Sequence, residues 1–305
     1  MFLYEICIMI VHKTESMSIM KSNLKKRIVS VFLACVCLMP AGGLQTAAVG
    51  IGEGDRYTVI PVLADGVRIT YGLKAHNTTY VPIREFCKAV DPGARVHWNE
   101  ETESATIKLD GLVIKLCIKN KYLTANGRYI YFESGIINIA GTTYVPIREL
   151  CRAFGLDPVW NAENKTISIN TEKMQFIAPG DGYYDESDLY WLSRLIYSEA
   201  GNQPIDGKIG VGNVVLNRVA DPSCPDTIYD VIFDSRYGVQ FYVAETGAVY
   251  EEPNEESEAA AGICLEGYNT VGDSIYFFNP GISASNWITA NRTYIAGIGD
   301  HLFYY

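Results

Sequence analysis

Hydrophobic positions recur at helical spacing in residues 187–201, which read SDLYWLSRLIYSEAG. Leu192, Leu195 and Ile196 fall on one face of a helix, and the Ser-Asp pair that opens the stretch is typical of a helix start. Glu199 follows at the same spacing, so its carboxyl group is predicted on the apolar face. Partial desolvation raises the pKa of a carboxyl group, which suits a general acid. A glutamate at a fraying helix end that turns into solvent is the alternative interpretation.

The rest of the C-terminal half alternates helical and extended patterns. Further helices and extended runs are predicted over residues 204–219, 226–233, 251–265, 274–279 and 300–305. Gly207, Gly210 and Gly212 are costly in the interior of a helix. We therefore expect another helix or the substrate to approach closely there. Residues 237–241 are a predicted loop.

Charge and cysteine content exclude several functions. The formal net charge is -10, which argues against a nucleic-acid partner. The charge is uneven, since residues 183–305 hold 5 basic and 18 acidic side chains, whereas residues 49–182 hold 15 of each. Five cysteines follow the N-terminal leader, an odd number with no CxxC pair, so we expect neither a disulfide framework nor a zinc site. No cofactor is expected.

An internal repeat organises the first half of the chain. The octapeptide TTYVPIRE occurs at residues 78–85 and again at residues 142–149, 64 residues later. A tryptophan follows each copy, Trp98 in the first and Trp160 in the second, and each leads into a β-rich run. Each copy is therefore predicted to form a strand, a short helix and a hairpin.

This repeated pattern resembles the copper amine oxidase-like N-terminal domain, a module common on secreted bacterial proteins. The resemblance covers about residues 57–170 as two half-repeats. It implies a non-catalytic spacer or a domain that associates with the cell wall. We do not expect copper, because His76 and His97 are the only histidines of the module and lie in different predicted elements.

From residue 189 the chain resembles the SleB-type cell wall hydrolase, or spore cortex-lytic, family. The matching motifs are SRLIYSEAGNQP, GKIGVGNVVLNRV, VQF, YFFNP and GDHLFYY, in the order of the family. The resemblance implies a lysozyme-like fold that cleaves the glycan strand of peptidoglycan, with Glu199 as the catalytic acid/base. The substrate-binding residues that it implies are Gln240, Phe241, Tyr276, Asn279 and His301. Alternatively, Gln240 closes its own loop and His301 is structural.

These observations predict an α+β protein, in which a duplicated small α+β module precedes a lysozyme-like, mainly helical catalytic domain. Basic residues before an apolar run at 28–39 have the layout of a secretory signal peptide, with an uncleaved membrane anchor as the alternative. The expected location is outside the cell or in the wall, including the spore cortex. The predicted parts are a signal peptide at 1–48, the module at 49–172, a linker at 173–186 and the catalytic domain at 187–305.

The reaction depends on whether a second carboxylate stands near Glu199. Asp188 lies about three turns earlier along the helix, and Asp206 resembles a first-turn acid, so neither is a convincing partner. A single glutamate fits a lytic transglycosylase, as the family resemblance also implies, with peptidoglycan glycan strands as the partner. The alternatives are a hydrolytic muramidase, an amidase and an inactive wall-binding protein.

Overall fold

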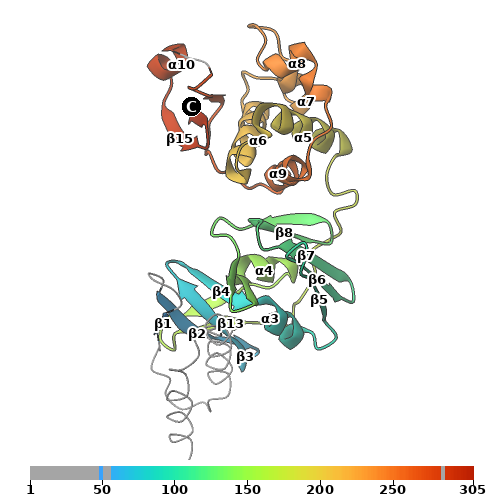
Figure 1. The fold of residues 1–305 in the computed structure, drawn as a ribbon, viewed down its shortest axis with the longest axis vertical. Coiled ribbons are helices and arrows are strands. Elements are labelled where there is room, and N and C mark those ends of the chain that lie inside the picture. Colours follow the sequence, from blue (N-terminus) through green and yellow to red (C-terminus); the bar gives the residue numbers. More distant parts are fainter. Residues whose placement is uncertain (1–47, 51–55, 283–285) are drawn as a thin grey trace, which may run out of the picture. The chain divides into compact units, whose positions relative to one another are not determined.

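The protein combines sheets and helices in the computed structural model, which describes residues 48–50, 56–282 and 286–305 (Figure 1). Strands dominate before residue 170 and helices dominate after residue 185. The predicted α+β fold class is therefore confirmed. Within the described ranges, no helix is both long and apolar enough to cross a membrane. The predicted signal peptide lies outside these ranges apart from Ala48.

The described residues divide into two compact units. Residues 93–135, which follow the first copy of the repeat, belong to the same unit as the helical C-terminal part. The domain boundaries suggested by the sequence remain predictions, since the compact units follow a different division. The first unit contains the described residues up to 92, with 136–150 and 157–173, and the second contains 93–135, 151–156 and 174–305.

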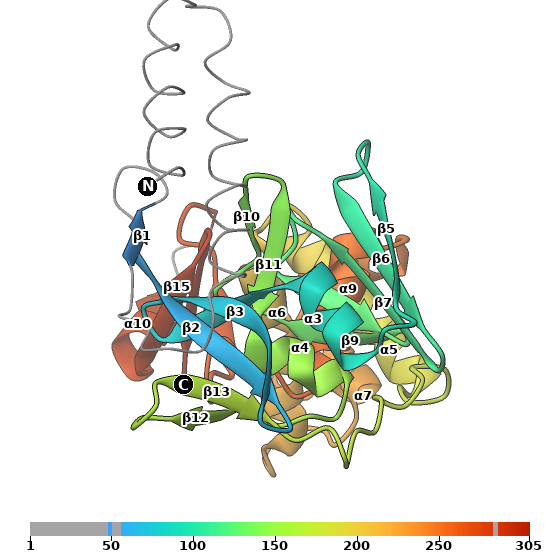
Figure 2. The ribbon, with the colours of Figure 1, turned by 90° about the horizontal axis from the view of Figure 1, so that it is seen from below.

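The first unit is built on one sheet with the strand order β10-β11-β4-β3-β2-β13-β12, in which β1 also pairs with β2 (Figure 2). All neighbours are antiparallel except β13, which runs parallel to β2. The strands are β1 (Ala48–Gly50), β2 (Arg56–Ala64), β3 (Val67–Ala75), β4 (Thr78–Pro82), β10 (Ile137–Ile139), β11 (Thr142–Pro146), β12 (Val159–Asn161) and β13 (Thr166–Ile169).

The two copies of the repeat pair with each other in this sheet. Strands β4 and β11 are antiparallel, and Val81 lies opposite Val145, its own counterpart 64 residues later. The two octapeptides are therefore related by a local pseudo-twofold axis between these valines. Helix α3 (Ile83–Val90) follows β4, and α4 (Ile147–Ala153) follows β11. Each helix leads into a hairpin, which confirms the predicted order of strand, helix and hairpin.

The second unit contains two further sheets and the remaining helices. An antiparallel meander has the order β5-β6-β7-β8-β9, and a smaller sheet near the C-terminus has the order β14-β16-β15. The strands are β5 (Arg95–Asn99), β6 (Ser104–Leu109), β7 (Leu112–Cys117), β8 (Tyr122–Ala125), β9 (Arg128–Tyr131), β14 (Tyr276–Phe278), β15 (Tyr294–Ile298) and β16 (His301–Tyr304). The helices are α5 (Glu186–Ala200), α6 (Ile205–Ala220), α7 (Ile228–Ile232), α8 (Tyr242–Thr246), η1 (Ala248–Tyr250), α9 (Glu255–Leu265) and α10 (Asn286–Asn291).

Helices α5, α6, α7 and α9 confirm the four predicted helices, with shifted ends. Helix α5 begins at Glu186 because Asp185 caps it, accepting hydrogen bonds from the backbone nitrogens of Ser187 at 2.9 Å and Asp188 at 3.1 Å. Helix α9 begins later than predicted, because Asn254 is its cap. The sequence did not predict α8, α10 or β15, which are short and lack a clear hydrophobic period.

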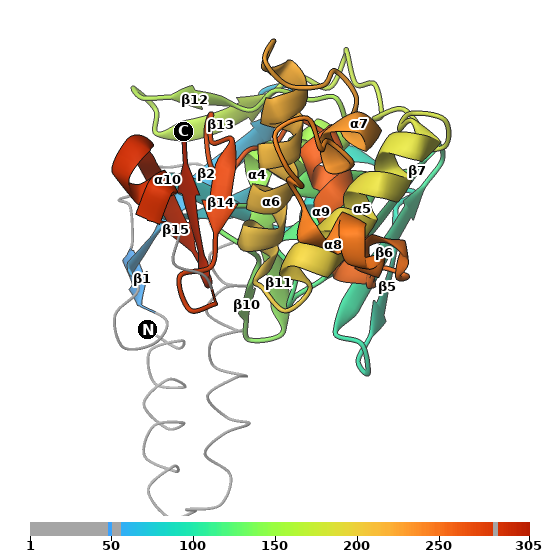
Figure 3. The same ribbon diagram turned by 90° about the horizontal axis from the view of Figure 1, so that it is seen from above.

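Close packing explains two of the three helix glycines in α6, which lies beside α5, α9 and the small C-terminal sheet (Figure 3). A Cβ atom at Gly212 would lie 2.7 Å from Cys264 Sγ, and one at Gly210 would lie 2.8 Å from the ring of Phe303. The predicted close approach is therefore confirmed at these positions, with protein side chains as the neighbours. At Gly207 a Cβ would make only ordinary contacts, the nearest at 3.4 Å.

The β5–β9 sheet packs on α9 within the second unit. Glu266 at the end of α9 has a fully buried side chain and accepts two hydrogen bonds from Arg128, at 2.8 and 2.7 Å. Tyr184 donates another at 2.7 Å. Beside this cluster, Gly262 leaves room for the ring of Tyr129, which a Cβ would approach to 2.3 Å. Charge pairing and close contact thus fasten the sheet to the helices.

Candidate active site

Glu199 lies in the last turn of α5, on the face that packs into the core. Leu192, Leu195 and Ile196 on that face are fully buried, and Glu199 itself is half-buried. Burial raises the pKa of the Glu199 carboxyl, and the charge of Arg218 opposes this shift without cancelling it. The carboxyl group thus occupies the desolvated position that the hydrophobic spacing predicts.

Arg218, near the end of α6, is the cation that faces Glu199. Its Nε donates a hydrogen bond to the carbonyl oxygen of Ile275 at 2.8 Å. Its guanidinium carbon lies 5.1 Å from the ring centroid of Phe241 and 5.9 Å from that of Tyr276. Burial lowers the pKa of Arg218, but an arginine side chain remains protonated at neutral pH. Two rings and a carbonyl therefore hold a fixed positive charge beside the carboxyl group.

A small pocket of about 70 Å³ opens beside Arg218. Two predicted substrate-binding residues, Gln240 and Tyr276, line it together with Arg218 and Asp234. The volume corresponds to about two water molecules, so the pocket admits a small substituent rather than a whole sugar ring. Its other lining residues are Ser223, Cys224, Pro225, Val231 and Ile275.

Asp234 contributes a carboxylate to this pocket. Both of its oxygens accept hydrogen bonds from the guanidinium of Arg236, each at 3.0 Å. This pairing lowers the pKa of Asp234, so the group is ionised at neutral pH. The sequence analysis missed Asp234, for which no motif gave a signal. It also missed Arg218, although the latter lies in the LNRV motif.

Three of the predicted substrate-binding residues have polar atoms at or near the surface. Gln240 is exposed, and its Nε2 donates to the carbonyl oxygen of Gly238 at 3.0 Å, as the loop-closing alternative expects. The hydroxyl of Tyr276 accepts a hydrogen bond from Arg292 at 2.7 Å. Asn279 is half-buried and its side-chain oxygen accepts from the backbone nitrogen two residues later. A substrate would have to share or displace these partners.

The other two predicted substrate-binding residues are buried. Phe241 is 2% exposed and His301 is 4% exposed. The ring of Phe277 lies between them, 6.4 Å from Phe241 and 5.3 Å from His301, measured between ring centroids. Burial lowers the pKa of His301, which is therefore neutral at physiological pH. In this structure both side chains therefore lie below the surface. Their contact with substrate remains a prediction.

Of the two carboxylates considered as partners of Glu199, one is engaged elsewhere and the other is distant. Asp206 accepts hydrogen bonds from Lys121 at 2.6 Å and from Tyr131 at 2.8 Å, which tie it to the β5–β9 sheet. Asp188 lies eleven residues before Glu199 on the same helix, about 16 Å along its axis. Asp234, which lines the pocket beside Arg218, is a further carboxylate near this site.

Metal-binding residues do not gather anywhere in the part of the chain that the structure describes. No group of three His, Cys, Asp or Glu side chains could hold an ion there. His76 and His97 are both exposed, one in the turn before β4 and the other on β5. The residues present therefore do not fit a copper centre.

Comparison with known families accounts for both halves of the chain. Residues 202–304 match the model of the cell wall hydrolase family. The C-terminal half contains a cell wall hydrolase domain. Residues 71–175 match the model of the copper amine oxidase N-terminal domain, so this second resemblance is also confirmed. The cell wall hydrolase match begins three residues after Glu199, and the catalytic role of that residue is thus a matter for experiment.

Spore cortex-lytic enzymes are relatives of the cell wall hydrolase domain. The enzyme from Bacillus cereus is 34% identical over 120 residues, which are 39% of this chain and 45% of that protein. The enzyme from Bacillus subtilis is 31% identical over 122 residues, 40% of this chain and 39% of that protein. This chain thus spans less than half the length of these relatives.

A solved structure is also similar in sequence to the cell wall hydrolase domain. It is the catalytic domain of the germination-specific lytic transglycosylase SleB from Bacillus anthracis. The two sequences are 32% identical, and the match covers 42% of this chain and 100% of that chain, with a TM-score of 0.37.

Proposed function

We propose that the protein is an exported enzyme that cleaves the glycan strand of peptidoglycan at N-acetylmuramic acid, as a lytic transglycosylase. The observation that carries the proposal is the half-buried carboxyl of Glu199, whose pKa is raised beside the fixed charge of Arg218. Support comes from the cell wall hydrolase domain, whose relatives are named as spore cortex-lytic enzymes and as a lytic transglycosylase.

Glu199 acts first as an acid and then as a base. Its proton passes to the oxygen that bridges two sugars, and the bond from that oxygen to C1 of N-acetylmuramic acid breaks. The carboxylate then takes the proton of the C6 hydroxyl, and O6 forms a new bond to C1. The product has a 1,6-anhydro end, no water is consumed, and Glu199 regains its proton.

Arg218 suits this double use of one carboxyl group. Desolvation favours the neutral acid that the first step needs, whereas the nearby positive charge favours the carboxylate that the second step needs. Burial and the charge of Arg218 thus act on Glu199 in opposite directions, and each favours one of the two protonation states that the reaction needs. The rings and the carbonyl that hold Arg218 keep its charge fixed while the proton moves.

The pocket beside Arg218 would select the substrate through a small substituent. An acetamido group fits a volume of about 70 Å³ better than a sugar ring does. Gln240 and Tyr276, which line the pocket, can donate to its carbonyl oxygen or accept from its N–H. Both sugars of the glycan strand carry such a group, so this contact positions the strand without distinguishing them.

Asp234 favours a second candidate, a hydrolytic muramidase. A hydrolase needs a second carboxylate that acts as a nucleophile or activates water. Asp234 is ionised and lines the pocket beside Arg218. However, both of its oxygens are occupied by Arg236, which makes it a weak base. The transglycosylase reaction is therefore the better fit.

The substitution Glu199→Gln tests the role of this residue. We expect cleavage of purified peptidoglycan to fall by about 10²–10⁴-fold, the usual contribution of a general acid. Glu245→Gln makes the same chemical change at an exposed glutamate of α8 and should leave the rate unchanged. Full activity in Glu199→Gln would refute the proposal. A parent protein that binds peptidoglycan without cleaving it would instead support a structural role.

A further inference from the structure

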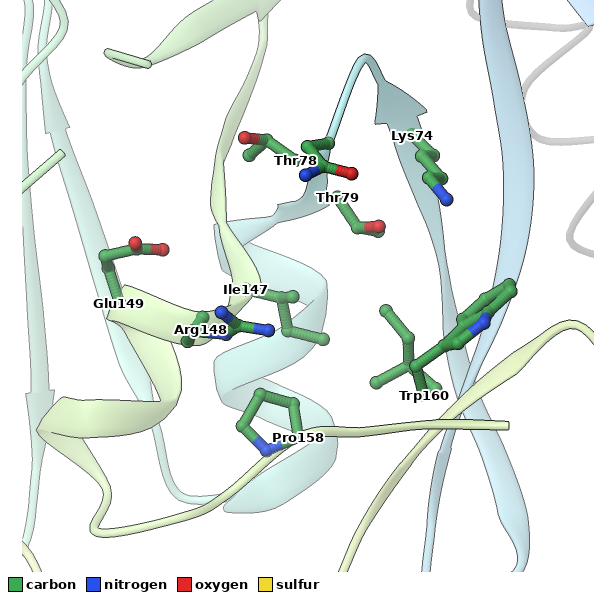
Figure 4. A pocket seen from close by; sticks show the side chains of 10 residues that line it. Lys74, Thr78, Thr79, Ile147, Arg148, Glu149, Pro158 and Trp160 are labelled. Carbon is green, nitrogen blue, oxygen red and sulfur yellow. The ribbon is translucent and has the colours of Figure 1, made fainter. Parts of the chain in front are cut away.

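The first unit holds a pocket of about 260 Å³, well separated in sequence from the hydrolase domain (Figure 4). It lies between the β3–β4 hairpin, the start of α4 and strand β12. Figure 4 shows the side chain of Arg148 directed toward the side where Trp160 lies, with Lys74 and Thr79 above and Pro158 below. The lining thus combines one large aromatic ring with charged and hydroxyl-bearing groups.

Trp160 is a partly exposed aromatic residue. It is 44% exposed on β12, whereas tryptophan side chains are highly buried on average. The ammonium nitrogen of Lys74 lies 5.1 Å from its ring centroid, a cation–π contact that holds the ring in place. Trp160 is one of the residues that line the pocket. A fixed, exposed aromatic surface of this kind suits the apolar C–H face of a sugar ring.

The polar groups around Trp160 suit a sugar that carries a carboxylate. Lys74 and the exposed Arg148 supply two positive charges, and a guanidinium can bind both oxygens of a carboxylate. Thr79 and Glu149 can bind hydroxyl and amide groups. Glu149 is half-buried, burial raises its pKa, and none of the described side chains donates a hydrogen bond to it. Its counterpart Glu85 accepts one from Thr70 at 3.0 Å.

Arg148 and Trp160 of this pocket come from the second copy of the repeat, whereas Thr78 and Thr79 come from the first. The counterpart of Arg148 is Arg84, which is also exposed, and the counterpart of Trp160 is Trp98. Trp98 lies on β5, whose hairpin joins the sheet of the other compact unit. The two copies therefore share the residues but not their arrangement. This difference supplies a matched control within one chain.

We propose that this pocket binds one N-acetylmuramic acid unit whose lactyl carboxylate is free, as in a peptidoglycan glycan strand from which the stem peptide has been removed. N-acetylmuramic acid carries both an acetamido group and a lactyl carboxylate, which the threonine and glutamate side chains and the two cations can bind. The volume is below the roughly 300 Å³ at which pockets for drug-sized ligands begin, so it suits one ring rather than a length of strand. The inference rests on the proposed function and gives the N-terminal module a specific ligand.

Binding is measured with the full chain carrying Glu199→Gln, so that turnover does not interfere. The probes are free N-acetylmuramic acid and N-acetylglucosamine, titrated by calorimetry, and insoluble peptidoglycan stripped of teichoic acid and, with an amidase, of its stem peptides, measured by co-sedimentation. We expect Trp160→Ala to weaken binding of N-acetylmuramic acid and of peptidoglycan about tenfold, as loss of an aromatic anchor does. Trp98→Ala and Arg84→Gln should leave both unchanged.

Arg148→Gln is a second variant that leaves the core intact, because Arg148 is exposed. It should weaken binding of N-acetylmuramic acid several-fold and leave that of N-acetylglucosamine, which lacks the lactyl group, unaffected. The inference is overturned if Trp160→Ala binds these probes as tightly as its parent, or if Trp98→Ala weakens binding as much as Trp160→Ala does. It is also overturned if binding requires teichoic acid. Because no variant is tested for cleavage here, failure of this inference leaves the catalytic proposal standing.

Discussion

The buried Glu266 should be essential to the stability of the second unit. Its carboxylate is fully inaccessible and accepts hydrogen bonds from Arg128 and Tyr184, all between 2.7 and 2.8 Å. Arg152 adds a longer contact at 3.2 Å. In Glu266→Ala the positive charge of Arg128, whose side chain is 12% exposed, would lose its partner inside the protein.

Removing one partner of a buried ion pair costs about 3–5 kcal/mol in free energy of unfolding, because the remaining charge is left uncompensated. We expect a loss of this size in Glu266→Ala. Glu266→Gln keeps the shape of the side chain and one acceptor oxygen, so it should lose less. The matched control is Glu103→Gln, which removes an ion pair with Lys119 whose side chains are 73% and 40% exposed. Such exposed pairs contribute little to stability, because solvent screens the two charges.

Urea unfolding followed by tryptophan fluorescence would measure these differences. Trp98 lies on β5 and Trp191 lies on α5, so the sheet and the helices each carry a probe. A single shared transition in the parent would show that the two unfold together. A loss below about 1 kcal/mol in Glu266→Ala, or separate transitions, would contradict the packing of the sheet on α9.

Two further predictions concern Glu199 and the glycines of α6. Because burial raises the pKa of Glu199, the folded protein binds this proton more tightly than the unfolded chain, so stability falls as pH rises through the folded-state pKa. Urea titrations should thus give Glu199→Gln the same free energy of unfolding as the parent near pH 3 and a higher one at pH 7. A lower free energy of unfolding at pH 7 would contradict this. Gly212→Ala, which forces a Cβ against Cys264, should lose about 1–3 kcal/mol, whereas Gly207→Ala should be neutral or gain up to about 1 kcal/mol by thermal denaturation. Equal effects of the two glycine substitutions would refute the packing explanation.

Local patterns predicted the elements that carry the candidate site. The period of Leu192, Leu195 and Ile196 located α5 and placed Glu199 on its buried face, as observed. The repeated octapeptide located β4 and β11, although not their pairing about Val81 and Val145. Such pairing joins segments 64 residues apart, and no local spacing reports it.

Long-range contacts explain what the sequence analysis missed. The bond between Arg128 and Glu266 spans 138 residues and joins two segments that seemed to belong to separate domains. Asp234 comes close to Arg218 only because the loop after α7 folds back, and nothing in the chain around it marks a site. His301 belongs to a conspicuous motif, yet neighbouring aromatic rings bury it. Motifs thus pointed to candidate residues, and tertiary packing decided which of them reach the surface.

The most direct test of the proposed reaction is mass spectrometry of the muropeptides that the protein releases from purified peptidoglycan, both vegetative and cortex. We predict 1,6-anhydro-muramic ends, lighter by one water than hydrolysed ends, and none of these products from Glu199→Gln. Ordinary reducing ends would contradict the transglycosylase reaction. They would point instead to water as the acceptor and to Asp234 as the second carboxylate.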